Sequence, residues 1–369
     1  MTDPGERLVN HFGVTNSYAT FARMASTTKA AAAKGAVMRT LLKLPKPVIR
    51  RLVGKPVVVD GKTLNPEMKL VLQLAKLDGP PVETQPVTRG RKQVIAASKL
   101  VGGSLPIGAV TDRLIDGPAG KLNLRFYTPK GMRGAAPALF FIHGGGWIYG
   151  DLESHDATCR FLAEEAQVRV IAVDYRLAPE APFPAAFDDT WAAYKWIVGN
   201  AAGIGVDIAR LAVGGDSAGG NLAAIIAQQA VREDFHAPTF QLLIYPATDF
   251  VIEHPSRETF AKGFYLSKAF MDLANENYLL GDEELDDPRL SPLRNDVKGV
   301  APAYLVTAGF DPLLDEGKEY ADKLRAAGVP VEYVCEEGLI HSFANMVSLG
   351  SAAPKAMRRA AAALQRGLS

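Results

Sequence analysis

Residues 211–221 of this 369-residue chain read Leu-Ala-Val-Gly-Gly-Asp-Ser-Ala-Gly-Gly-Asn and lead into a helical stretch, Leu222 to Val231. Ser217 therefore stands between a buried strand and a helix, with a glycine two residues away on each side. A nucleophile elbow has this arrangement, because the glycines permit a sharp turn that lifts the serine hydroxyl above the sheet. The Gly-x-Ser-x-Gly pattern alone is a weak signal, and its place between strand and helix strengthens it. We predict that Ser217 is a nucleophile.

A serine hydroxyl needs a base, and the base needs an acid that orients it. On an elbow of this kind the expected chain order is serine, acid, histidine, each after a later strand. His341 and Asp311 each follow a candidate strand, at the sheet edge where sites form in open α/β folds. His236 and His254 also come later, but they lie in polar loops without that placement. The sequence therefore favours His341 as base and Asp311 as acid.

A glycine-rich stretch supplies candidate donors for the oxyanion that acyl transfer creates. The apolar strand 138–142 ends in His143-Gly144-Gly145-Gly146-Trp147. Consecutive glycines leave main-chain N–H groups unobstructed, and the N–H of Ala218, the residue after the nucleophile, would complete the hole. No Gly-x-Gly-x-x-Gly with an acidic ribose partner follows, which argues against a dinucleotide site.

The rest of the chain from Lys121 onward alternates strands with helical stretches. Several strands are continuous β-branched or apolar runs, which is typical of buried parallel strands. The pattern predicts an α/β protein with a mostly parallel sheet covered by helices. The candidate strands are Leu122–Tyr127, Ala138–Ile142, Arg169–Asp174, Leu211–Gly214, Gln241–Tyr245, Ala303–Ala308 and Val331–Cys335.

Composition narrows the function classes. With 41 Lys+Arg, 40 Asp+Glu and 48% apolar residues, the net charge is +1, which excludes a disordered chain and a strongly basic nucleic-acid binder. Two cysteines exclude a disulfide framework and a four-cysteine zinc site. Because no apolar run reaches membrane-spanning length and no secretory leader pattern is visible, we expect a cytoplasmic protein without a transmembrane segment.

Four motifs together resemble one known family. They are His143-Gly-Gly-Gly-Trp147, Asp174-Tyr-Arg-Leu-Ala-Pro-Glu180, Gly215-Asp-Ser-Ala-Gly-Gly-Asn221 and Asp311-Pro-Leu313. In this order they are similar to the bacterial hormone-sensitive-lipase family of α/β-hydrolase carboxylesterases, in its GDSAG branch. The resemblance runs from about Val58 to the C-terminus and is highly specific.

The resemblance implies an α/β-hydrolase fold with a helical cap made of N-terminal helices and an insertion after the sixth strand. It also implies a serine carboxylesterase that hydrolyses short- to medium-chain esters through an acyl-enzyme, without metal or organic cofactor. By motif, Ser217 is the nucleophile, His341 the base and acid, and Asp311 its orienter. The oxyanion site falls on Gly144, Gly145, Gly146 and Ala218, with the second and third glycines as donors. By the same analogy an edge strand would permit a homodimer.

Two further acids lie near these motifs. Asp315 competes with Asp311 for the acid role, but its place fits support of the following helix better. Asp216 is expected to point away from the nucleophile and to support the site.

The chain divides into five predicted segments. A basic N-terminal extension, N-terminal cap helices, the first part of the hydrolase core, a cap insertion and the second part of the core follow one another. Their bounds are 1–57, 58–105, 106–249, 250–300 and 301–369.

The extension stands apart in charge, and the family resemblance says little about it. Between Glu6 and Asp60 there is no acidic residue, whereas ten basic ones occur. Composition favours a helix from about Tyr18 to Leu44, interrupted by Pro45 and Pro47. Such a segment either packs on the main domain with a solvated face, which its weak apolar stripe favours, or makes peripheral contact with anionic membranes.

Three other functions remain open from the sequence. Cap-bearing hydrolase folds also serve as ligand-binding receptors, although those lack a competent histidine and this chain has His341. An amidase or deacetylase would use the same three side chains. A lipase acting at a lipid surface would make use of the basic extension. A small-molecule ester, rather than a nucleic acid, is the expected partner.

Overall fold

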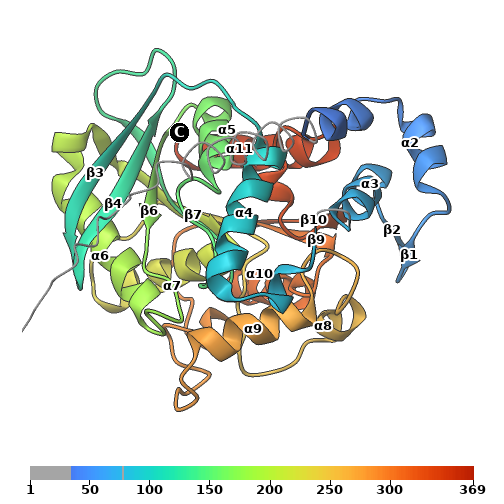
Figure 1. The fold of residues 1–369 in the computed structure, drawn as a ribbon. Coiled ribbons are helices and arrows are strands. Elements are labelled where there is room, and N and C mark those ends of the chain that lie inside the picture. Colours follow the sequence, from blue (N-terminus) through green and yellow to red (C-terminus); the bar gives the residue numbers. More distant parts are fainter. Residues whose placement is uncertain (1–34, 77–78) are drawn as a thin grey trace, which may run out of the picture.

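The computed structural model of the protein describes residues 35–76 and 79–369 (Figure 1). Its centre is an eight-stranded sheet in the order β10-β9-β8-β7-β5-β6-β4-β3, in which β4 runs antiparallel to both neighbours and the pairs from β6 to β10 are parallel. The sheet is therefore mostly parallel, as predicted. Its strands are β3 (Ala109–Gly117), β4 (Gly120–Thr128), β5 (Ala136–Ile142), β6 (Arg169–Asp174), β7 (Val206–Asp216), β8 (Phe240–Ile244), β9 (Ala303–Phe310) and β10 (Val331–Ile340).

Helices cover both faces of this sheet. On β5, Leu139 and Phe141 join one buried cluster while Phe140 and Ile142 join the other, so both faces are apolar. One cluster includes α5 (Asp156–Ala166) and α11 (Ala352–Gly367). The opposite cluster includes α6 (Ala185–Asn200), α7 (Ala218–Arg232) and α10 (Leu314–Ala326). The predicted α/β-hydrolase architecture is confirmed.

The hairpin at one edge of the sheet was only half predicted. Strand β3 was not expected, since its sequence is polar and most of its side chains are exposed. Pairing with β4 across the turn at Pro118-Ala119, with Gly117 opposite Gly120, is what makes it a strand. An edge strand of this kind carries no apolar run in its sequence.

The N-terminal helices lie against the core. The two longer helices in this part of the chain are α3 (Pro66–Ala75) and α4 (Val87–Gly102). Asn65 caps α3, its side chain accepting from the Glu67 N–H at 2.8 Å. The remaining short elements here are α2 (Lys46–Val53), β1 (Val58–Val59), β2 (Lys62–Thr63) and η1 (Val82–Thr84).

The described part of the N-terminal extension packs on the body of the protein. Residues 35–42 are helical, and the part of the predicted helix before residue 35 lies outside the described residues. The sequence did not predict α2, whose second residue is Pro47, a position where proline is tolerated because that N–H has no helical partner. The side chains of Met38, Leu42, Ile49 and Val53 are buried.

The insertion after β8, the sixth strand of the main sheet, contains α8 (Pro255–Thr259), α9 (Lys268–Tyr278) and η3 (Pro292–Arg294). Helix α9 packs against η1. The turns η2 (Ala201–Ile204) and η4 (Phe343–Asn345) complete the element list. In the two described ranges no helix has the length and apolarity needed to cross a membrane.

Candidate active site

Ser217 sits in the tight connection between β7 and α7. Its backbone has φ 56° and ψ −121°, a conformation that costs energy for a residue with a side chain. A Cβ on Gly215 would lie 2.4 Å from the Ile142 carbonyl oxygen, and one on Gly219 would lie 2.0 Å from the same atom. Strand β5 therefore comes so close that both positions must be glycine.

His341 and Asp311 follow two other strands and lie close to Ser217. His341 follows β10 and its Nε2 lies 3.0 Å from the Ser217 Oγ, while its Nδ1 lies 2.7 Å from the Asp311 Oδ2. Asp311 follows β9, is fully buried, and its Oδ1 accepts from the Leu313 N–H at 2.9 Å. The Tyr245 ring packs beside the imidazole, with centroids 4.4 Å apart. The three side chains form one hydrogen-bonded chain, although 124 residues separate Ser217 from His341.

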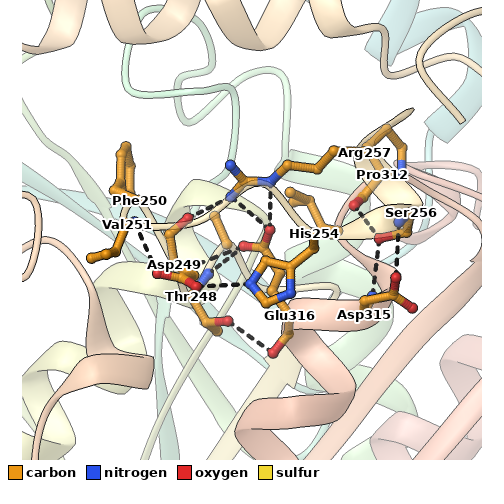
Figure 2. A network of polar contacts seen from close by, with 12 residues as sticks. Thr248, Asp249, Phe250, Val251, His254, Ser256, Arg257, Pro312, Asp315 and Glu316 are labelled. Carbon is orange, nitrogen blue, oxygen red and sulfur yellow. Dashed lines mark hydrogen bonds and ion pairs between the residues drawn. The ribbon is translucent and has the colours of Figure 1, made fainter. Parts of the chain in front are cut away.

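The Asp315 side chain contacts Ser256 and not His341. Its Oδ2 accepts from the Ser256 N–H at 2.8 Å, and the Ser256 hydroxyl donates to the Pro312 carbonyl at 2.7 Å (Figure 2). Asp315 makes no helix cap, but it lies in the first turn of α10, where an acidic side chain supports a helix, and its carboxylate fastens α8 of the insertion to α10.

A buried charge network continues from this contact. Figure 2 shows Arg257 lying between the Asp249 main chain and Glu316. The Arg257 Nε donates to Glu316 Oε2 at 2.9 Å, and Glu316 Oε1 accepts from the Thr248 N–H at 2.7 Å. His254 Nε2 lies 2.8 Å from Asp249 Oδ2. Burial raises the pKa of Glu316, although Arg257 opposes this. The network joins the start of the insertion to α10, so it supports the site without touching Ser217.

The three glycines of the loop after β5 do not play equal parts. The Gly144 N–H donates to the Asp216 Oδ1 at 2.9 Å, so it is not free for a ligand. The N–H groups of Gly145, Gly146 and Ala218 donate to no acceptor within the described ranges. Gly145 and Gly146 have φ of 124° and 62°, and a Cβ on Gly145 would lie 2.3 Å from the Tyr149 carbonyl. The loop thus needs glycine for its conformation and for its tight packing.

Asp216 is the buried anchor of that loop. Besides Gly144, its Oδ1 faces the His155 Nε2 at 3.2 Å, and its Oδ2 lies 3.4 Å from the Tyr245 hydroxyl. Burial alone would raise the pKa of Asp216, but His155 and the Gly144 N–H favour the carboxylate and bring the pKa below its ordinary value. His155 was not predicted as part of the site, because it precedes Ser217 in the chain and the expected base follows it.

The insertion and the N-terminal helices close over these groups. Trp147 stacks on Tyr278 of α9 at 4.7 Å, and Arg91 of α4 donates to the carbonyls of Ile148 and Ala178 at 2.9 and 2.8 Å. Ser217 opens into a cavity of about 80 Å³. Its other lining residues include Gly146, Trp147, Phe250, Leu266, Phe270 and Met271.

This arrangement can carry out acyl transfer. It combines a hydroxyl in contact with an imidazole, a buried carboxylate behind that imidazole, and main-chain donors beside the hydroxyl.

Comparison with known proteins agrees with the geometry. A family model described as alpha/beta hydrolase fold matches residues 139–345. The carboxylic ester hydrolase LipN of Mycobacterium tuberculosis is 42% identical over 338 residues, which cover 88% of this chain and 89% of the relative. An ethyl acetate hydrolase of Pseudomonas putida is 37% identical over 321 residues, covering 83% of this chain and all of the relative.

Solved structures give the same result. One is the ester hydrolase EH1AB1 from the metagenome of Lake Arreo, complexed with a bipyridine phosphonate derivative. It is 44% identical to this chain with a TM-score of 0.80, and the match covers 82% of this chain and 98% of the other. An esterase from the archaeon Pyrobaculum calidifontis is 35% identical with a TM-score of 0.79, and the match covers 82% of this chain and 98% of the esterase. The chain therefore belongs to the bacterial hormone-sensitive-lipase family of α/β-hydrolase esterases and is a carboxylic ester hydrolase.

Proposed function

We propose that the protein hydrolyses short- to medium-chain carboxylic esters through a Ser217–His341–Asp311 triad and an acyl-enzyme. The observation that carries this is the continuous chain of contacts, 3.0 Å from Ser217 Oγ to His341 Nε2 and 2.7 Å from His341 Nδ1 to Asp311.

In the first half-reaction, Ser217 Oγ attacks the ester carbonyl carbon while His341 Nε2 takes the hydroxyl proton. Asp311 holds the imidazole through Nδ1 and stabilises its positive charge. The N–H groups of Gly145, Gly146 and Ala218 bind the oxyanion of the tetrahedral intermediate. As the intermediate collapses, the imidazolium gives its proton to the departing alcohol. Water then attacks the acyl-enzyme by the same route, which releases the acid and restores Ser217.

Substitution of the nucleophile tests this mechanism. Ser217→Ala should lower kcat on p-nitrophenyl acetate by roughly 10³-fold or more, because the covalent route is lost. A phosphonate ester should add its phosphonyl group to the wild-type chain and not to the variant, as intact mass spectrometry would record. An active, unlabelled Ser217→Ala protein would exclude the mechanism.

The size of the cavity favours small acyl groups. About 80 Å³ is well below the 300–1,000 Å³ of pockets for drug-sized ligands. The Pseudomonas relative, named for ethyl acetate, is consistent with a small ester. Across p-nitrophenyl esters, kcat/KM should be highest for the shorter chains and fall towards palmitate. Matched anilides should react much more slowly, whereas faster cleavage of the anilides would favour the amidase interpretation.

The other parts of the interpretation remain predictions. These are the five-segment division, the cytoplasmic location, the homodimer and the membrane contact of residues 1–57.

A further inference from the structure

Helix α2 presents two apolar pairs in different directions. Ile49 and Val53 are buried, and the helix packs against α3. Val48 and Leu52, one helical turn apart on the neighbouring face, are 42% and 56% exposed. Because residues four apart lie side by side on a helix, these two side chains form one small apolar strip on the surface.

Basic residues flank this strip along the chain. All the basic residues between positions 43 and 55 are exposed, and none forms an ion pair with a described residue. They are Lys43, Lys46, Arg50, Arg51 and Lys55. No acidic residue occurs between Glu6 and Asp60, although the chain as a whole carries a net charge of only +1. The cationic charge is therefore concentrated in this part of the sequence.

We propose that this surface, which we call the α2 surface and define as Val48, Leu52 and these five cations, docks on an anionic lipid surface. Exposed cations are attracted to lipid phosphates, and the apolar side chains of the same exposed segment gain free energy by entering the acyl boundary. A nucleic acid would satisfy the cations but would leave Val48 and Leu52 in water. The α2 surface contains none of the groups assigned to ester hydrolysis, so docking and catalysis are separable.

Vesicle co-sedimentation of the full chain tests the proposal. The protein should sediment with vesicles of phosphatidylcholine and phosphatidylglycerol and not with phosphatidylcholine alone. Binding should fall strongly at about 1 M NaCl, where the screening length is roughly 3 Å. Arg50→Glu with Arg51→Glu should weaken binding at least tenfold, given a contribution of about fivefold per cation near the surface. Val48→Ser with Leu52→Ser should also weaken binding, without removing its dependence on salt.

A matched control separates the α2 surface from overall charge. Arg133→Glu with Lys298→Glu makes the same change in net charge at two other exposed positions. This variant should bind like the wild type, and all variants should keep wild-type hydrolysis of p-nitrophenyl acetate, which shows that they are folded. Absence of vesicle binding by the wild type, or equal losses in the control and the α2 variants, would overturn the proposal. So would tight binding to a DNA oligonucleotide that Val48→Ser with Leu52→Ser leaves unchanged.

Discussion

Removing the Asp216 carboxylate should disable the proposed oxyanion donors while leaving Ser217, His341 and Asp311 in place. Asp216 is 2% exposed, and its Oδ1 holds the Gly144 N–H at 2.9 Å. Gly144 precedes the two glycines proposed as donors, so this contact fixes where their N–H groups point. Asp216→Ala is the perturbation that deletes the contact.

The size of the effect follows from that hydrogen bond. A hydrogen bond to a buried charged group contributes about 1.5–3 kcal/mol. If that free energy is what keeps the loop in its competent conformation, its loss lowers kcat by roughly ten- to hundredfold, since 1.4 kcal/mol is about a factor of ten. KM should change little, because the oxyanion exists only after the attack. Asp216→Asn keeps an oxygen acceptor for Gly144 and loses the charge that faces His155, so its kcat should lie between those of the wild type and Asp216→Ala.

Steady-state kinetics on p-nitrophenyl acetate, with thermal melting of each variant, would measure this. Intact mass spectrometry after phosphonate labelling would show that Ser217 is still accessible. The reasoning is refuted if Asp216→Ala is folded and its kcat stays within twofold of the wild type, or if the loss lies entirely in KM.

Three more predictions concern the two acids near His341, the buried His143 and the cavity beside Ser217. Asp311→Asn should lower kcat/KM by about 10³-fold or more, because the His341 Nδ1 loses its carboxylate partner. Asp315→Asn removes only the charge of the group that accepts from the Ser256 N–H, and should change kcat/KM less than tenfold. Equal losses in the two variants would contradict the assignment of Asp311. Burial, with a smaller contribution from His155, lowers the pKa of His143 to about 4. At pH 5 this histidine is therefore neutral in the folded chain, whereas in the unfolded chain it takes up a proton. The free energy of unfolding should therefore fall by about 2 kcal/mol between pH 7.5 and 5 from this group, and urea titrations should show that His143→Asn lacks that part of the loss. Phe270→Ala on α9 should enlarge the cavity and shift the preference among p-nitrophenyl esters towards longer acyl chains, and an unchanged chain-length profile would mean that Phe270 does not limit the cavity.

Much of the architecture could be read along the chain because it depends on local patterns. Runs of apolar residues mark strands that are buried on both faces, as in β5 and β9, and the structure has strands at all seven predicted places. The polar β3 and the proline-bearing α2 were missed, because a hairpin partner and a packing surface create them rather than their own composition.

The amino-acid sequence by itself determined the fold class, the family and the strand-end positions of Ser217, Asp311 and His341. It could do so because the sharp turn at Ser217 accepts only glycine two residues before and two residues after it, and because parallel strands bring their carboxyl ends to one edge. Only the tertiary structure decided which of two nearby acids faces His341, which glycine N–H is taken by Asp216, and how little space lies beside Ser217. Each of these depends on contacts between residues far apart in the chain, where spacing carries no information about distance.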